Sequence, residues 1–221
     1  NQNDMEDAVE KELSIRALGE DPLVLSISYN TDLMAFENIV PITRSWINFA
    51  NTKSDLVIEV RTKSAFFSSL SDLTPSNKII FSWTLSPESV VRKNEIDTPP
   101  LNRRLTAIKL AISKGWKIRL CFDPVIIYDN WEEDYSDLLD KIIYSIEKKN
   151  IYDITVGVFR MGRDYFQRVR KSNPDSIEYY KNYVDENKIM TVSQEQKNSL
   201  KTLFTNKLKH YITEDKIHFW I

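Results

Sequence analysis

The stretch LCFDPVIIYDNWEEDY (residues 120–135) contains the pattern that decides the fold. Its first half is an apolar, strand-like run. We expect this strand to end at Asp123, because Pro124 lacks the N–H that a strand ladder needs. Its second half leads into SDLLDKIIYSIEKK (136–149), where apolar residues recur at helical spacing. A strand followed directly by a helix is the repeating unit of a parallel α/β fold.

Five segments have the composition of strands, because they are rich in Val, Ile, Phe and Tyr. They are LVLSISY (23–29), LVIEVRT (56–62), KIIFSWTL (78–85), KIRLCFD (117–123) and YDITVGVF (152–159). Helical patterns alternate with them at 4–18, 37–50, 64–73, 101–115 and 136–149. This alternation predicts parallel strands joined by right-handed crossovers. The C-terminal part (174–212) is expected to be mostly helical, and the closing KIHFWI (216–221) is typical of one more short strand.

The length, net charge and cysteine count of the chain limit its classes of function. The chain has 221 residues, enough for one domain with a substantial core. A net charge of −2 gives no global reason to expect binding to nucleic acid or membranes, and no apolar run approaches the roughly 20 residues that span a bilayer. One cysteine excludes an intrachain disulfide and cannot by itself hold a metal cluster. It is typical of a reducing, cytoplasmic setting.

Each predicted strand has one apolar face and one polar face. The same alternation continues into the residues that follow each strand. The residues on the polar faces are Ser26, Ser28, Asn30 and Asp32; Glu59, Arg61 and Lys63; Ser82, Thr84 and Ser86; Arg119, Cys121 and Asp123; and Thr155 with Gly157. We expect a curved or partial barrel whose concave side holds something polar. The alternative is a flat sheet with helices on one side and water on the other. Asp32, Lys63, Ser86 and Asp123 stand at the carboxyl ends of strands, where parallel α/β folds place their sites.

Six motifs stand at these strand ends in a fixed order. They are SYNTD (28–32), EVRTKS (59–64), SWTLSP (82–87) with a following E…TPPLNRRLTA (95–107), GWKIRLCFDPVI (115–126), NWEEDY (130–135) and TVGVFR (155–160). In this order they resemble the spore photoproduct lyase family of radical S-adenosylmethionine (SAM) proteins. The resemblance runs from the helix before Leu23 to Arg160, and more loosely to the end of the chain.

The resemblance implies a fold, a cofactor and a reaction. The fold would be a partial (β/α)6 TIM-like barrel of the radical SAM type, lacking its first strand, with parallel strands and helices outside. Residues 1–160 would form the barrel and 161–221 a C-terminal helical extension packed on it. SAM and a [4Fe–4S] cluster would lie in a polar lumen, and a 5′-deoxyadenosyl radical would act on a DNA lesion or another substrate. The implied SAM-binding residues are Thr31, Asp32, Lys63, Ser82, Thr84, Ser86 and Asp123.

The sequence departs from the family at two points. The cluster of the family needs three cysteines in a CxxxCxxC loop, and this chain has Cys121 alone. We therefore expect the C-terminal two-thirds of a longer radical SAM protein, with Cys121 as a core or lumen-facing thiol and no metal ligand in this chain. The alternative is a cluster-less module that binds nucleic acid or a partner. Tyr29 stands where the family has its hydrogen-donating cysteine, and a phenol is a possible hydrogen donor.

Other candidate residues have ordinary structural explanations. The basic run FRMGRDYFQRVRKSNP (159–174) includes candidates for DNA phosphate contacts, namely Arg160, Arg163 and Arg168, although a solvated helix face is the simpler interpretation. Glu59 is expected to pair with Arg61 or Arg119 rather than to act as a catalytic acid or base. Trp131 and Tyr135 would stack on a base or pack their loop. The two histidines, His210 and His218, have no spacing of metal ligands.

Overall fold

The computed structural model describes residues 1–17, 19–28, 30–174 and 181–221 of the chain. The strands are Leu23–Ile27 (β1), Leu56–Thr62 (β2), Ile79–Thr84 (β3), Lys117–Val125 (β4), Ile151–Val158 (β5), Arg160–Gly162 (β6), Val184–Glu186 (β7), Ile189–Thr191 (β8) and Ile217–Trp220 (β9). The helices are Gln2–Ile15 (α1), Ile42–Asn51 (α2), Glu88–Asn94 (α3), Leu101–Ser113 (α4), Trp131–Ser145 (α5), Arg163–Ser172 (α6) and Gln194–Leu208 (α7), with 3-10 turns that include Leu33–Phe36 (η1) and Phe67–Leu70 (η2).

Six strands form one sheet in the order β1-β2-β3-β4-β5-β9. The pairs β1/β2, β2/β3 and β5/β9 are parallel, as the alternation of strands and helices predicts. The strand expected in KIHFWI is confirmed as β9. The short strands β6, β8 and β7 form a separate antiparallel sheet, so the part of the chain after Arg160 is less helical than expected.

Element ends differ from the sequence predictions where proline or local turns intervene. The expectation that Pro124 ends its strand is wrong, because β4 continues to Val125. The helix expected over 37–50 begins only at Ile42, directly after Pro41, and residues 37–40 form turns that follow η1. In the segment 64–73 the structure contains only the single turn η2.

The chain forms two compact units, each assembled from separate stretches. Unit 1 comprises 1–84, 97–120 and 149–152, and unit 2 comprises 85–96, 121–148 and 153–221. The division predicted at residue 160 stays a prediction.

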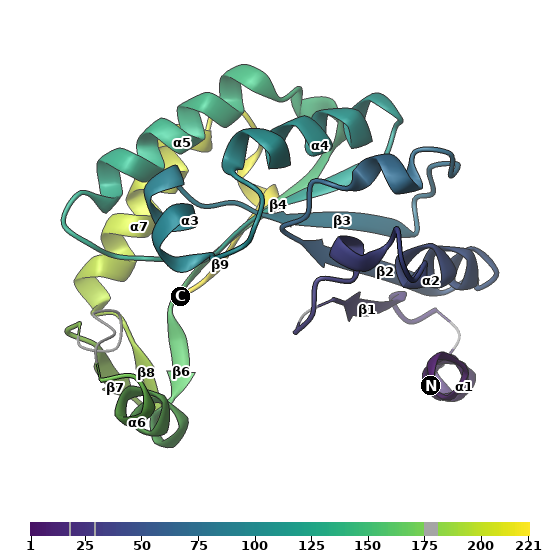
Figure 1. The fold of residues 1–221 in the computed structure, drawn as a ribbon, viewed down its shortest axis with the longest axis horizontal. Coiled ribbons are helices and arrows are strands. Elements are labelled where there is room, and N and C mark those ends of the chain that lie inside the picture. Colours follow the sequence, from purple (N-terminus) through teal and green to yellow (C-terminus); the bar gives the residue numbers. More distant parts are fainter. Residues whose placement is uncertain (18, 29, 175–180) are drawn as a thin grey trace. The chain divides into compact units, whose positions relative to one another are not determined.

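In unit 1, β1, β2 and β3 lie side by side, and α2 packs against them (Figure 1). Burial along β2 alternates residue by residue, as expected for a strand with one covered face. On the next strand, Phe81 packs edge-on against Phe67 of η2, with ring centroids 5.3 Å apart, and against Trp116, at 5.2 Å. The helix-covered face is therefore the one that carries Phe81.

Helix α4 of unit 1 starts and stops at residues that suit those positions. Pro100 precedes its first residue, where a missing N–H costs nothing. Gly115 follows its end with φ +94°, a left-handed conformation that favours glycine. The backbone N–H of Trp116 then donates to the carbonyl of Ala111, and this contact directs the chain into β4.

The core of unit 2 is aromatic. The ring centroid of Phe122 in β4 lies 5.2 Å from that of Phe204 in α7, and Tyr135 of α5 lies 6.2 Å from Phe204. Helix α7 begins with a capping box, in which the Ser193 side chain accepts from the N–H of Gln196 and the Gln196 side chain accepts from the N–H of Ser193. These contacts fix α7 over the second half of β4.

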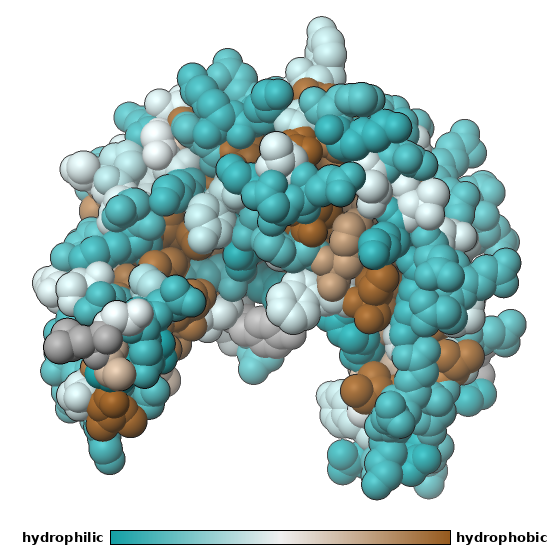
Figure 2. All heavy atoms as spheres, turned by 180° about the vertical axis from the view of Figure 1, so that it is seen from behind, coloured by the Kyte–Doolittle hydropathy of each residue, from teal (hydrophilic) through white to brown (hydrophobic). Residues whose placement is uncertain are grey.

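On the face shown in Figure 2, most surface atoms belong to hydrophilic residues, with scattered apolar patches. Within the described part of the chain, no helix combines the length and the apolar character needed to cross a membrane.

Candidate functional site

The predicted residues Thr31, Asp32 and Lys63 lie together in unit 1, where the loop after β1 meets the end of β2. The carboxylate of Asp32 accepts from the hydroxyl of Thr62, at 2.8 and 3.1 Å, and from the backbone N–H of Lys63, at 2.7 Å. Thr62 is buried and its hydroxyl oxygen in turn accepts from the N–H of Ser64, at 2.8 Å. Asp32 therefore fixes the rim of the sheet.

The loop itself is held by Ser28, which has a left-handed backbone with φ 69°. Its hydroxyl donates to the carbonyl of Thr31 at 2.6 Å and accepts from the N–H of Leu33 at 2.7 Å. The side chain of Thr31 is exposed and that of Lys63 is half-buried. Tyr29, the predicted hydrogen donor, lies outside the described residues.

Ser82 and Thr84 lie on the face of β3 opposite to Phe81 and Trp83, because neighbouring strand residues point to opposite sides. Ser82 pairs in register with Arg61 of β2. Ser82 has no solvent exposure, and its hydroxyl has no hydrogen-bond partner among the residues that the structure describes. Buried polar atoms without partners are rare and need an explanation.

The polar face of unit 1 also contains an ion pair. A guanidinium nitrogen of Arg119 lies 3.1 Å from a carboxylate oxygen of Glu59, and both side chains are largely buried. The guanidinium also lies over the ring of Tyr152, 5.8 Å from its centroid. The expectation that Glu59 pairs with Arg61 or Arg119 is confirmed, with Arg119 as its partner.

The remaining SAM candidates, Asp123 and Ser86, belong to unit 2. Arg160 donates to both carboxylate oxygens of Asp123, at 3.1 and 3.3 Å, and also to the carbonyl of Trp220 in β9. Ser86 donates to Glu95 at 3.2 Å. Asp123 and Arg160, predicted for different ligands, are therefore partners of each other.

The basic segment lies on α6 and at its start. Arg163 contacts Asp185 at 3.1 Å and Asp164 at 3.7 Å. Arg168 lies over the ring of Tyr165, 5.7 Å from its centroid. Much of the positive charge here is balanced by carboxylates, and DNA contact by these arginines stays a prediction.

Metal-binding chemistry has little support in the described residues, which contain no group of three or more His, Cys, Asp or Glu able to hold a metal ion. Cys121 is buried, between Leu120 and Phe122 in β4. His218 lies 3.5 Å from Asp153, a contact within unit 2.

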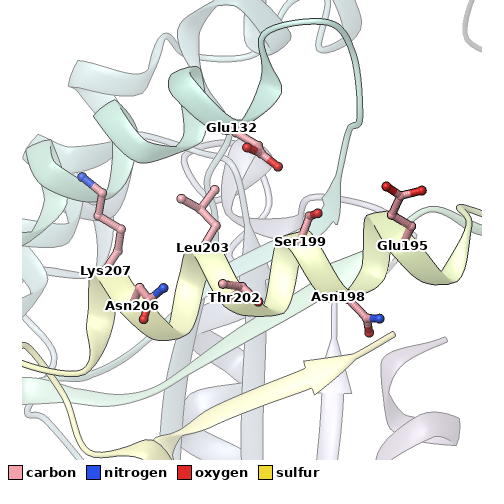
Figure 3. Close-up of a pocket in the computed structure, with 8 residues that line it drawn as sticks. All are labelled: Glu132, Glu195, Asn198, Ser199, Thr202, Leu203, Asn206 and Lys207. Atoms are coloured by element: carbon pink, nitrogen blue, oxygen red, sulfur yellow. The ribbon is translucent and has the colours of Figure 1, made fainter.

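Among the residues of unit 2 that the structure describes, two pockets are lined by none of the predicted SAM residues. One, of about 880 Å³, runs along α7 between Glu195 and Lys207, with Glu132 of α5 on its other side (Figure 3). The other, of about 760 Å³, lies at the start of α5 and includes Tyr128 and Trp131. Sequence reasoning noted Trp131 but missed Tyr128, and it also missed Thr62 and Glu95 as partners of predicted residues.

The chain resembles known proteins in sequence. A family model described as spore photoproduct lyase matches residues 20–221. The spore photoproduct lyase of Bacillus subtilis (strain 168) is 27% identical over 94 residues, which are 42% of this chain and 28% of that protein. The spore photoproduct lyase of Geobacillus sp. (strain Y412MC61) is 21% identical over 125 residues, 57% of this chain and 37% of that protein. The matched stretches thus span well under half of these relatives.

The fold also matches solved structures. A spore photoproduct lyase mutant with bound AdoMet and dinucleoside spore photoproduct aligns with a TM-score of 0.83 at 16% identity, over 99% of this chain and 66% of that one. A mutant with dinucleoside spore photoproduct aligns equally well. The partial barrel fold of the radical SAM type, expected from the sequence, is confirmed. With its family model matching nearly all of the sequence, the chain belongs to the spore photoproduct lyase family.

Proposed function

We propose that this chain holds SAM against the polar face of unit 1, and that the whole protein uses SAM in radical chemistry on a DNA lesion. The observation that carries the proposal is the hydroxyl of Ser82, which is buried without a partner on that face. Leaving such a group unpaired costs about 1–3 kcal/mol. The hydroxyl has no exposed surface, so a ligand would reach it only after the side chains that cover it move, and a hydrogen bond to that ligand would then remove this cost.

The side chains around Ser82 suit the polar parts of SAM. Thr84 offers a second hydroxyl on the same face of β3, and hydroxyls can bind a ribose. The ammonium of Lys63 and the exposed hydroxyl of Thr31 lie at the rim, and a lysine can bind the SAM carboxylate. The carboxylate of Asp32, held by Thr62 and Lys63, keeps this rim in place. Asp123 and Ser86, which the sequence also assigned to SAM, belong to unit 2 and stay predictions.

A [4Fe–4S] cluster does not fit the residues present. Such a cluster is held by cysteine thiolates, and the sequence contains one cysteine, which is buried in β4 between apolar neighbours. A cluster would need thiolates from outside these 221 residues. The DNA substrate is proposed because two solved relatives are described with dinucleoside spore photoproduct.

The single cysteine favours a second candidate, a cluster-less module that binds nucleic acid or a partner. The two candidates differ in their need for SAM. A radical SAM protein binds SAM specifically, whereas a cluster-less module has no reason to retain that site.

Calorimetric titration with S-adenosylhomocysteine, a stable SAM analogue, tests the proposal. We expect binding that Ser82→Ala weakens about two- to tenfold, the value of one neutral hydrogen bond. Ser145→Ala is the matched control, because the Ser145 hydroxyl is also buried without a partner in the described structure but belongs to α5 of unit 2. No binding, or equal effects of the two substitutions, would contradict the site.

Lys63→Met tests the charge at the rim. The substitution keeps most of the apolar stem and removes the ammonium, so the fold should survive. A charge-assisted hydrogen bond contributes about 1.5–3 kcal/mol, or roughly ten- to a hundredfold in affinity. Lys114→Met, at an exposed position after α4, is the control and should leave the affinity unchanged. Unchanged affinity in Lys63→Met would remove Lys63 from the proposed site.

A further inference from the structure

No residue assigned to SAM lines the pocket at the start of α5. It is enclosed by the loop after β4, the first turn of α5, residues 181–183 and the start of α7, all within unit 2. Its volume of about 760 Å³ lies in the range of sites for small molecules, roughly 300–1,000 Å³.

One wall of this pocket is fixed by two hydrogen bonds to a single carboxylate oxygen. The hydroxyl of Tyr128 donates to a carboxylate oxygen of Asp134 at 2.5 Å, and the hydroxyl of Ser89 donates to the same oxygen at 2.6 Å. The two hydroxyls lie 3.1 Å apart. Burial, together with the bond to Asp134, raises the pKa of Tyr128 to about 12, so its phenol stays protonated. The Tyr128 ring is therefore presented to the pocket in one orientation.

The apolar part of the lining is mainly aromatic. Trp131 is almost fully buried, which limits its motion. Tyr183 stacks on Phe159, with ring centroids 4.5 Å apart and planes inclined by 29°. Tyr128, Trp131 and Tyr183 thus line one pocket with aromatic side chains that are each held by other contacts. Aromatic side chains of this kind stack on flat ring systems.

The polar part of the lining contains three amides beside four charged side chains. Asn130, Asn182 and Gln196 line the pocket, and the asparagines are exposed. An amide presents a donor and an acceptor side by side, and this arrangement matches the hydrogen-bonding edge of a nucleobase.

The charges around the pocket nearly cancel. Two lysines, Lys93 and Lys181, face two aspartates, Asp129 and Asp134. Such a balance gives little attraction for a phosphate, which needs an excess of positive charge. A flat, neutral ligand with hydrogen-bonding edges fits better.

We infer that this pocket receives a single unpaired nucleobase of the DNA substrate. The inference rests on the proposed function, since it assumes that the protein acts on nucleic acid. Bases outside a duplex are recognised by stacking on aromatic rings and by hydrogen bonds to their edges, and the pocket provides both.

Photo-crosslinking tests where the base lies. The probe is a short single-stranded thymidine oligonucleotide with one 4-thiothymidine, irradiated with the protein and mapped after trypsin digestion. We expect crosslinks in the peptides 120–141, which contains Tyr128 and Trp131, or 182–188, which contains Tyr183. Crosslinks confined to other peptides, or none, would overturn the inference.

A matched pair of substitutions tests the amides. Asn130 precedes α5 and its side chain makes no capping hydrogen bond, so Asn130→Ala should leave the helix intact. It should weaken binding of the same oligonucleotide about fivefold or more, because the edge of the base loses its hydrogen bonds to the amide. Asn206→Ala removes an exposed amide from the other pocket of unit 2 and should change nothing. Equal affinities for Asn130→Ala and the unchanged protein would overturn the inference.

S-adenosylhomocysteine separates this inference from the proposed function. At saturation it should leave the crosslinks unchanged, and so should Ser82→Ala. Loss of the crosslinks on adding S-adenosylhomocysteine would mean that the pocket holds the adenosine of SAM, and would overturn the inference. Crosslinks that persist in a protein unable to bind S-adenosylhomocysteine would count against the SAM site alone.

Discussion

Oδ1 of Asp123 lies so close to the Cα of Gly157 that a Cβ added at residue 157 would stand 2.3 Å from it. The same Cβ would lie 3.0 Å from a guanidinium nitrogen of Arg160. Glycine at this point of β5 is therefore what allows the carboxylate of Asp123 and the guanidinium of Arg160 to pair above the strand.

Gly157→Ala should displace Asp123 and disrupt its pair with Arg160. We expect the free energy of unfolding to fall by about 1–3 kcal/mol, the usual cost of overpacking. Gly162→Ala is the control, because a Cβ there meets nothing within 4 Å. Urea denaturation of both variants is the measurement. Similar losses in the two would show that the contact with Asp123 is unimportant.

The ion pair between Glu59 and Arg119 should stabilise unit 1 because water has little access to it. Glu59→Gln should lower the free energy of unfolding by about 2 kcal/mol, since it removes the carboxylate charge that faces a largely buried guanidinium. Asp140→Asn breaks the exposed pair with Lys207 and should cost less than about 1 kcal/mol. Added salt should reduce the effect of Asp140→Asn more than that of Glu59→Gln. The opposite ranking would disprove this account.

Tyr211 should make the stability of unit 2 sensitive to alkali. Its hydroxyl donates to the carbonyl of Ile146 at 2.9 Å, and burial raises its pKa to about 12. In the unfolded chain its pKa is near 10, so the stabilisation is complete below about pH 10 and is lost as the pH rises towards 12.

Tyr211→Phe should reduce this loss between about pH 10 and 12, and should cost about 1 kcal/mol near neutral pH through the missing hydrogen bond. Tyr144→Phe is the control, because Tyr144 is 95% exposed. Denaturation followed by circular dichroism at several pH values measures both. An unchanged alkaline slope in Tyr211→Phe would refute the assignment.

Without ligand, the hydroxyl of Ser82 should slightly lower the free energy of unfolding. Ser82→Ala removes a buried group that has no partner in the described structure, so we expect the free energy of unfolding to stay the same or to rise by up to about 1 kcal/mol. Thermal unfolding in the absence of nucleosides is the measurement. A clear destabilisation would mean that Ser82 has a hydrogen-bond partner within the protein, and would weaken its role in binding SAM.

The period of two along the strands made most of the sheet predictable. In β2 the alternation of Ile58, Glu59, Val60 and Arg61 indicates both the strand and its covered face, because only a strand places alternate residues on opposite sides. Composition alone could not place the end of β4, since proline is tolerated where its missing N–H is not needed by a neighbour.

The contacts of the candidate site were less predictable. Nothing in the local sequence links Asp32 to Thr62, because their hydrogen bond depends on how the loop after β1 returns to β2. Likewise, Asp123 and Arg160 were assigned to different ligands because each was interpreted within its own segment. Partners that are distant in sequence become visible only when the strands that carry them are paired.

The division of the chain into interleaved units has a consequence for synthesis. The chain passes from one unit to the other after Thr84, Ile96, Leu120, Lys148 and Tyr152. The last stretch of unit 1, residues 149–152, thus leaves the ribosome only after two of the three stretches of unit 2. Unit 1 is therefore completed at Tyr152, after part of unit 2 has been made and before its last stretch, whereas the domains of most multidomain chains are made one after the other. The nascent chain must keep the partly formed unit 2 from aggregating until residues 153–221 are made.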